Sequence, residues 1–520
     1  MLVLTTAAAM VMSLAIIPAY ASSTAVATGD STADGRPVIW KNRDHWSTPD
    51  GWKVVPYTYE ADGSSFGSGD SFGSRFDYTG ITALGESGRD SITGDRIPWA
   101  GSNDRGLGFV QVAGHTLTSS FADQHGYPVS QDLDKGMTGG YMNHVLLSRA
   151  EHVDEVERIL RDTNDGGGFN GSTARNTSTI ISVFDRWGNA ATFEIDGDSF
   201  TRDNVTEEHL PDGDGRYTSP HDDDKDGPNP PDGEYSGFDW RTNFSKVDWT
   251  KPSGFPYFVD EQLTTVDGDG NVVNEGSEPD GIHDWSYSSS AVYRHTRVGI
   301  RMDDPHDKNY RYFMQQEVES HGVPTEHSIE TLSRSIGNLP YENGSGQAEK
   351  PTGWHASRFV STFGFVSVGS KADDPYDGKL ATIWVALGEP SVSVFVPIFP
   401  YAGEIPDELT DMYLASNDKR HQVYDYTEDD SCGYSCGRNV DHSIDLDALV
   451  GPGGYYGEGG IQEYTFGIED WAFDEYDAFM ADLRTGDRTE AELRADMAEW
   501  QQRMAATMKG HYIAGTVPTG

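Results

Sequence analysis

The chain has 520 residues, of which 84 are acidic and 38 basic, and its formal net charge is -46 at pH 7. Such a negative surface repels nucleic acids and anionic membranes, because binding to either requires cationic side chains that replace counterions. The 25 Tyr, 22 Phe and 12 Trp residues supply ample material for a core, which excludes a disordered polyanion. Because the acidic residues are spread along the whole chain, we interpret the charge as an adaptation to a high-salt environment.

The first predicted element is an apolar leader over residues 1–21. Its apolar run is followed by the small-residue pattern Ala19-x-Ala21, which is typical of a secretory signal peptide and its cleavage site. Cleavage there would release a secreted, extracellular protein that begins at Ser22 and has no stable membrane insertion. An N-terminal serine offers a hydroxyl nucleophile together with an α-amine that can act as its base. An uncleaved anchor or a buried first helix is the alternative for this segment.

Behind the leader, the hydrophobic pattern indicates mainly strands and a few helices. The predicted strands are 24–28, 36–41, 106–113, a hairpin over 179–195 that turns at 186–189, and 358–367, 381–387 and 392–397. Helices are predicted over 141–162 and 488–508, the second with Asp487 and Glu490 as its capping box. Strands before and after helices, without a regular βαβ alternation, favour a layered α+β fold in one large domain.

Only two cysteines occur, Cys432 and Cys436, and they are four positions apart. A single close pair in an exported chain favours a small loop disulfide. A metal site is the alternative, although the other two ligands that it would need are missing nearby.

A motif in three parts follows the expected cleavage site. Ser22 is followed by the turn Asp34-Gly35 and by the cluster Lys41-Asn42-Arg43-Asp44. This order resembles the mature N-terminus of the N-terminal-nucleophile (Ntn) amidohydrolases, above all the choloylglycine hydrolase and penicillin V acylase group and the acyl-coenzyme A:isopenicillin N acyltransferase-like proteins. In that pattern a nucleophile opens the first strand, an Asp-Gly turn follows, and a basic-Asn-x-Asp cluster closes the second strand.

Later segments resemble the same group. They are an Asn-x-x-Gly-Leu strand over 103–109, an Asp-x-x-Gly hairpin over 183–194 that ends in Glu, the Arg-Thr-Asn segment over 240–245, and a late strand pair over 383–397. The resemblance thus covers most of residues 22–400.

What the resemblance implies for the fold is a four-layer αββα sandwich of two stacked antiparallel sheets. We expect an Ntn-hydrolase domain over 22–470, with acidic loop insertions near 205–240 and 260–285, and a C-terminal helical extension over 471–520.

The resemblance also implies a mechanism. Ser22 Oγ would attack a linear amide carbonyl while its α-amine shuttles the proton, and water would then hydrolyse the acyl-enzyme. Asn243 would donate its side-chain amide to the developing oxyanion, and Asp44 would hold the α-amine. Lys41 would supply positive charge beside the attacking oxygen. Each residue also has a structural interpretation: Ser22 as an ordinary small residue after a signal peptide, Asp44 and Lys41 as an ion pair at a strand end, and Asn243 as a turn cap or the start of a glycosylation sequon.

Two arginines are expected to contact the substrate. Arg43, two positions after Lys41, could supply the positive charge in its place. Arg297 is expected at the rim of the substrate pocket. The substrate implied is a small-molecule amide or an acylated amino acid, with acyl transfer to another amine as a competing reaction. The mechanism uses no metal and no cofactor.

The first residue departs from the group's pattern, because serine stands where these proteins most often have cysteine. Other Ntn acylases use serine, which keeps the acylase interpretation open. A secreted Ntn-type dipeptidase and a catalytically inactive, calcium-holding surface protein are the alternatives. The second of these draws on the Asp-x-Asp-x-Asp-Gly spacing over 222–227 and on a shorter version over 267–271. In so acidic a chain, such runs also arise from composition alone.

Overall fold

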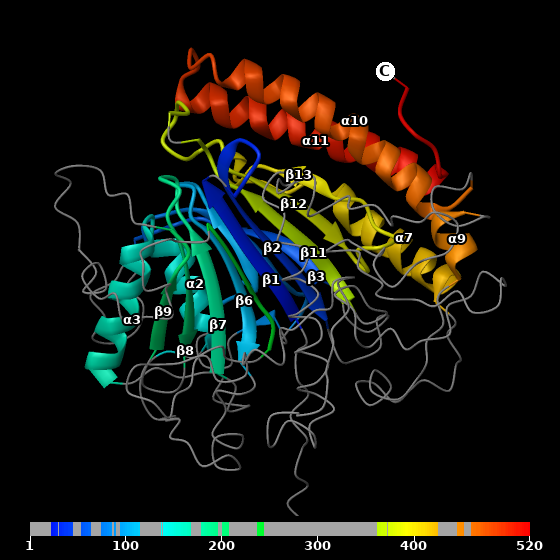
Figure 1. The fold of residues 1–520 in the computed structure, drawn as a ribbon. Helices are drawn as coiled ribbons and strands as arrows, with labels where there is room; N and C mark the ends of the chain where they lie inside the picture. Colours follow the sequence, from blue (N-terminus) through cyan, green and yellow to red (C-terminus); the bar gives the residue numbers. More distant parts are fainter. Residues whose placement is uncertain are drawn as a thin grey trace, which may run out of the picture.

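The computed structural model consists of two stacked antiparallel sheets between layers of helices (Figure 1). It describes residues 22–29, 31–44, 54–63, 74–85, 88–89, 94–114, 137, 139–167, 178–195, 200–206, 237–243, 361–371, 373–424, 445–451 and 459–519.

One sheet has six strands and contains the beginning of the described chain. In spatial order its strands are β10 (Phe238–Arg241), β1 (Ser22–Gly29), β2 (Gly35–Asp44), β11 (Ser361–Val368), β12 (Thr382–Leu387) and β13 (Val396–Ile398). All of its pairs are antiparallel.

The other sheet has seven strands that follow one another along the chain. They are β3 (Val54–Tyr59), β4 (Tyr78–Ala83), β5 (Ala100–Asn103), β6 (Gly108–Gly114), β7 (Ser178–Phe184), β8 (Ala190–Ile195) and β9 (Phe200–Asn204). The faces of β1 and β2 that look inward pack on β6 and β7 of this sheet.

Helices cover the outer face of each sheet. The seven-stranded sheet carries α2 (Gly139–Arg149) and α3 (Val153–Gly167), whose apolar residues join one core cluster with β6, β7 and β8. The six-stranded sheet carries α7 (Glu408–Val423), α10 (Ile461–Leu483) and α11 (Glu490–Ala514), with the 3-10 turn η6 (Pro400–Ala402) and the short α9 (Leu446–Val450) beside them. The predicted four-layer αββα sandwich is confirmed.

The strands at the centre are buried on both faces, because one face meets the other sheet and the opposite face meets helices. Every residue of β11 is buried, and in β1 only the last residue is exposed. On the helix side, the indole of Trp384 lies 5.1 Å from the ring of Phe473 and 5.3 Å from that of Tyr476, both in α10. Truncating a buried ring of this kind typically costs about 3 to 5 kcal/mol, so these contacts attach the helix pair firmly to the sheet.

Figure 1 shows α10 and α11 as a long pair that lies across the sheet. The boundary expected between residues 470 and 471 falls inside α10. No helix in the described part of the chain is long and apolar enough to cross a membrane.

Two details of the predicted helices were wrong. The single helix expected over 141–162 is two helices, α2 and α3, which are separated by residues 150–152. The capping box of α11 is formed by Thr489 and Glu492 instead of Asp487 and Glu490. The Glu492 nitrogen donates to Thr489 Oγ1 over 3.3 Å, and the Thr489 nitrogen donates to Glu492 Oε2 over 2.8 Å. The hairpin expected over 179–195 is confirmed as β7 and β8.

Candidate active site

Strand ends of the six-stranded sheet bring the candidate residues together. Because neighbouring strands are antiparallel, the start of β1 lies beside the end of β2, and the end of β2 lies beside the start of β11. Ser22 opens β1, Asp44 closes β2, and Ser361 opens β11. Asp44, at the end of the strand beside Ser22, therefore meets Ser361, which is 317 positions away in sequence.

The face on which Ser22 lies also carries two cationic residues. In the β1–β2 ladder Ser22 pairs with Arg43, and Thr24 pairs with Lys41. Residues that pair directly in an antiparallel ladder project from the same face of the sheet. Ser22, Arg43 and Lys41 therefore share one face, and all three are buried.

Asn243 holds the nitrogen of Ser22. In the β1–β10 ladder Thr24 pairs with Arg241, and the same register two residues further on places Asn243 opposite Ser22. The Ser22 nitrogen donates to Asn243 Oδ1 over 2.8 Å, and Asn243 Nδ2 donates to the carbonyl oxygen of Ala113 over 2.9 Å. Asn243 thus contacts Ser22 through its oxygen and the other sheet through its nitrogen.

Strand β6 supplies two backbone acceptors to the site. Strand β5 begins at Ala100, which pairs with Val110 of β6. One residue further along β6, the nitrogen of Gln111 donates to the carbonyl of Trp99, the residue just before β5. The N–H and C=O of one residue project to the same side of a strand, so the carbonyls of Gln111 and Ala113 both project toward the side on which β5 has ended. Lys41 Nζ donates to the first of these carbonyls and Asn243 Nδ2 to the second.

Arg43 stacks on an aromatic ring beside the nucleophile. Its guanidinium carbon lies 3.6 Å from the centroid of the Trp99 ring, which is a close cation–π contact. The Trp99 ring stacks in turn on Phe363, the residue that pairs with Arg43 in β11. Burial lowers the pKa of Arg43 to about 9, while the charge of Asp44 acts in the opposite direction. Arg43 remains cationic at pH 7.

Asp44 is held from the neighbouring strand. It is 2% exposed, and its Oδ1 accepts a hydrogen bond from Ser361 Oγ over 2.6 Å. The β2–β11 register shifts between Ser361 and Phe363, so β11 carries one extra residue at this point. Bulges of this kind redirect side chains and are frequent beside active sites.

Two features of this arrangement decide the fold type. The two antiparallel sheets are stacked between helical layers, and the candidate nucleophile opens a central strand of one sheet on the face toward the other. This is the αββα arrangement that the Ntn resemblance implies.

Among solved structures, the molecule is similar to a mutant of conjugated bile acid hydrolase from Clostridium perfringens and to penicillin V acylase from Agrobacterium tumefaciens. The first match has 11% sequence identity and a TM-score of 0.33, and it covers 72% of this chain and 92% of the hydrolase. The second has 16% identity and a TM-score of 0.24, and it covers 35% of this chain and 49% of the acylase. No protein-family model matches the sequence, and no curated protein does.

A buried ionic cluster anchors the strand that leads to Asn243. Arg241 is 0% exposed and forms ion pairs with Glu194, at 3.4 Å, and with Asp203 and Asp239. Burial alone would lower the pKa of Arg241, but the three carboxylates outweigh it and raise that pKa. Glu194 and Arg241 belong to two separate motifs of the Ntn resemblance, and the fold brings them into contact.

The Asp34-Gly35 turn of the Ntn resemblance has a structural role. Asp34 accepts from the Arg36 nitrogen at 3.2 Å and pairs with Arg36 Nε at 2.7 Å. Arg36 then reaches α10, where its Nη1 donates to the hydroxyl of Tyr476 over 3.3 Å. Gly35 has a φ of +78°, a left-handed conformation that other residues adopt at a cost. The turn therefore ties the β1–β2 hairpin to the helical layer.

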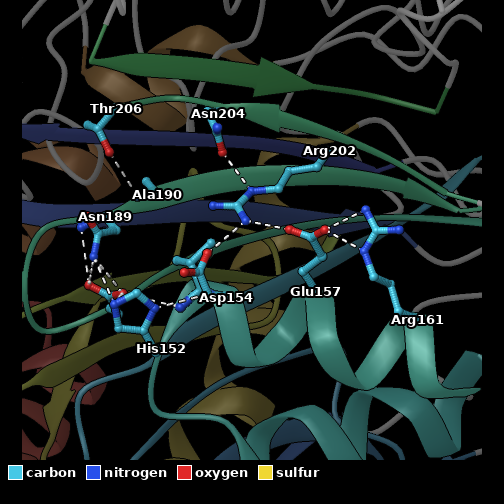
Figure 2. Close-up of polar contacts among 11 residues, drawn as sticks. His152, Asp154, Glu157, Arg161, Asn189, Ala190, Arg202, Asn204 and Thr206 are labelled. Atoms are coloured by element: carbon cyan, nitrogen blue, oxygen red, sulfur yellow. Dashed lines mark hydrogen bonds and ion pairs between the residues drawn. The ribbon is translucent and has the colours of Figure 1, made fainter. Parts of the chain in front are cut away.

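The Asp-x-x-Gly motif has a structural role as well, beside His152 and Asn189, which Figure 2 labels. Asp185 Oδ1 accepts from the nitrogen of Trp187 at 2.9 Å and from that of Asn189 at 3.2 Å, which fixes the β7–β8 turn. Asp185 Oδ2 accepts from the nitrogen of Val153 at 3.2 Å, at the start of α3. The ring of His152, at 3.5 Å from the same oxygen, completes the junction.

Next to this junction, Arg202 joins α3 to the edge of the seven-stranded sheet (Figure 2). Its Nη1 lies 2.8 Å from Asp154 Oδ1 and 2.6 Å from Glu157 Oε2, and Arg161 pairs with the same glutamate at 2.7 Å. Arg202, Asp154 and Glu157 are buried. Breaking one member of such a network leaves an uncompensated buried charge, so its role is to hold the fold.

Several predicted features lie outside the described residues. They are the leader over 1–21, Arg297, the Asp-rich loops 222–227 and 267–271, and Cys432 with Cys436. Within the described ranges, no group of three or more His, Cys, Asp or Glu side chains is arranged to hold a metal ion.

No sequence pattern pointed to the residues that hold Lys41, Asn243, Arg43 and Asp44 in place. Gln111 and Ala113 act through backbone carbonyls, which every residue has. The chain has many other tryptophans and serines, so the sequence alone does not single out Trp99 or Ser361. The folded structure identifies Trp99 as the neighbour of Arg43 and Ser361 as the neighbour of Asp44.

Proposed function

We propose that this chain is a secreted Ntn-type amidohydrolase that cleaves linear amide bonds, with Ser22 as its nucleophile after removal of residues 1–21. The observation that carries the proposal is the contact of the Ser22 nitrogen with Asn243 Oδ1 at the head of a central strand. In the full chain this nitrogen belongs to a peptide bond. Cleavage before Ser22 turns it into an α-amine, which Asn243 would then hold beside the Ser22 hydroxyl.

The first half of the reaction forms an acyl-enzyme. The Ser22 oxygen bonds to the amide carbon while the α-amine takes the hydroxyl proton. The amine then passes that proton to the leaving nitrogen as the C–N bond breaks. Lys41, on the Ser22 face, stabilises the negative charge that develops on the oxygens at the reacting carbon. Asn243 Nδ2 carries two hydrogens, so its donation to Ala113 is compatible with a second donation to the oxyanion.

The second half of the reaction releases the acid. A water molecule attacks the ester carbon, the α-amine takes the water proton, and that proton returns to the Ser22 oxygen as the C–O bond to serine breaks. Asp44 orients the protonated amine through its negative charge. Transfer of the acyl group to another amine would follow the same path with that amine in place of water.

Arg43 and Arg297 are the proposed substrate contacts. Arg43 is cationic and lies on the same face as Ser22, which favours a substrate with a negative or strongly polar group next to the amide. The substrate class that we propose is a small-molecule amide or acylated amino acid. We further propose that the enzyme works outside the cell at high salt.

The first experiment tests maturation. The chain, expressed with its leader in a halophilic host, is purified from the medium, and its N-terminus is determined by mass spectrometry. Periodate converts the amino alcohol of an N-terminal serine into an aldehyde, which an aldehyde-reactive tag detects. We expect one mature form that begins at Ser22 and accepts the tag. A different N-terminus would refute the proposed nucleophile.

The second experiment tests catalysis. The mature protein in high salt is offered penicillin V, N-acyl amino acids and dipeptides, and amine release is measured. Ser22→Ala should abolish hydrolysis, Ser22→Cys should retain it, and Ser23→Ala, which changes the neighbouring residue on the opposite face, is the matched control. Equal activity of Ser22→Ala and the unmodified protein would refute the mechanism.

A further inference from the structure

Ser361 connects the proposed site to the helical layer behind the six-stranded sheet. Its hydroxyl donates to Asp44 Oδ1 over 2.6 Å, a short hydrogen bond of the charge-assisted kind. Ser361 is 0% exposed, so water does not reach its hydroxyl and replace its hydrogen bond to Asp44. The hydroxyl is therefore a fixed donor to Asp44.

The backbone of Ser361 is itself held in two ways. The shift of register between Ser361 and Phe363 inserts Thr362 as an extra residue, and Thr362 Oγ1 donates to the carbonyl of Arg43 over 3.1 Å. From the last turn of α7, Arg420 Nη1 donates to the carbonyl of Ser361 over 3.3 Å, and the Arg420 side chain is 1% exposed. The bulge and the buried arginine together determine where the Ser361 hydroxyl points.

We propose that Ser361 is a positioning residue of the proposed amidohydrolase: it aims the Asp44 carboxylate at the α-amine of Ser22, and Arg420 keeps Ser361 in place. The inference rests on the proposed function and adds to it a relay from α7 to the nucleophile. In this relay Ser361 acts on the nucleophile through Asp44.

The test uses the mature, full-length protein and measures acylation of Ser22 in a single turnover. The probe is p-nitrophenyl acetate, and the acylated N-terminal peptide is quantified by mass spectrometry at pH 7. The variants are Ser361→Ala, which removes the donor, and Ser361→Thr, which keeps it. Ser367→Ala removes another buried serine of the same strand, far from Asp44, and is the matched control. Thermal unfolding of each variant verifies folding.

For Ser361→Ala we expect labelling about tenfold slower at pH 7. Ser361→Thr, which keeps the donor, and Ser367→Ala should be labelled at the rate of the unmodified protein. In a double-mutant cycle, Ser361→Ala should add nothing to the effect of Asp44→Asn, because the hydroxyl acts only through that carboxylate.

The outcomes separate the inference from the proposed function. Labelling of Ser22 at the unmodified rate in Ser361→Ala would overturn the inference and leave the nucleophile intact. Additive effects of Ser361→Ala and Asp44→Asn would overturn it too. Absence of Ser22 labelling in the unmodified mature protein would refute both, because the relay has no function without a reactive Ser22.

Discussion

The side-chain oxygen of Asn243 accepts a hydrogen bond from the nitrogen of Ser22 over 2.8 Å, across 221 positions of sequence. The same amide group donates to Ala113 on the other sheet. An asparagine held at both ends cannot rotate without losing one of these hydrogen bonds. Asn243 therefore fixes the orientation of the Ser22 nitrogen relative to the Ser22 hydroxyl.

Replacing Asn243 tests which end of the amide matters. For Asn243→Ala we expect a loss of at least about 100-fold in kcat/KM, because both the acceptor for the α-amine and the donor are removed. Asn243→Asp keeps an oxygen for the amine and loses the donor. Retention of more activity in Asn243→Asp than in Asn243→Ala would identify the amine contact as the important one. Equal losses would favour the oxyanion role.

Asn103 belongs to a motif of the Ntn resemblance, yet its contacts are structural. Its Nδ2 donates to the carbonyls of Leu147 and Ala150, and its Oδ1 accepts from the nitrogens of Arg105 and Leu107. Asn103→Ala should lower the free energy of unfolding by about 2 to 4 kcal/mol, because buried backbone groups lose their partners. Urea unfolding measures this. The folded fraction should keep its kcat, and a large drop in kcat with unchanged stability would contradict the assignment.

His144 makes stability depend on pH. His144 Nδ1 forms a hydrogen bond with the hydroxyl of Tyr78 at 2.7 Å. Burial lowers the pKa of His144 to about 4, against the opposing effect of Asp95. Because the pKa of His144 is lower in the folded protein than in the unfolded chain, protons bind the unfolded chain more tightly. The contribution of neutral His144 to the free energy of unfolding is complete above the unfolded pKa and is lost as the pH falls toward 4, by about 2 kcal/mol at pH 5.

The matched variant for this prediction is His144→Asn, which keeps an acceptor for Tyr78 and cannot titrate. Urea unfolding of both proteins at pH 7 and pH 5 should show a steeper loss of stability in the unmodified protein. Parallel behaviour of the two proteins would contradict the role of His144.

The net charge of -46 predicts a strong dependence of stability on salt. At low ionic strength the acidic surface repels itself, and salt near 1 M reduces the screening length to about 3 Å. We expect the thermal midpoint to rise by about 10 °C or more between 0.1 M and 2 M KCl. Sucrose at equal osmolality is the control, since it leaves charge repulsion in place. A midpoint that does not change with KCl would contradict the interpretation of the acidic surface.

The sequence was sufficient for features that depend on local pattern. The turn residues from Gly29 to Gly35 marked β1 and β2 on either side, and those from Arg186 to Asn189 marked the β7–β8 hairpin. The helical spacing over 141–162 was also real, but it did not reveal the break between α2 and α3. That break depends on Asp185, which accepts the nitrogen of Val153 from a turn 32 residues away. Such a tertiary contact leaves no trace in helical periodicity.

The candidate site was predictable from the sequence only in part. The spacing from Ser22 to Asp44 fixes a hairpin, so the placement of Arg43 opposite Ser22 follows once the two strands pair. The contact between Ser22 and Asn243 depends on a second pairing across 221 positions, which only the resemblance suggested. The donor on Ser361 depends on a bulge of one residue, and a one-residue shift is below what hydrophobic patterning resolves.

The stretch of β6 beyond the end of β5 has a consequence for how this protein can change during evolution. Lys41 and Asn243 are held by carbonyls of Gln111 and Ala113, and a carbonyl is the same in every amino acid. Point substitutions at these two positions therefore leave both acceptors in place. A deletion or insertion of one residue in β6 would turn both carbonyls toward β7. In descendants of this protein, the length of β6 should consequently vary less than its residues do.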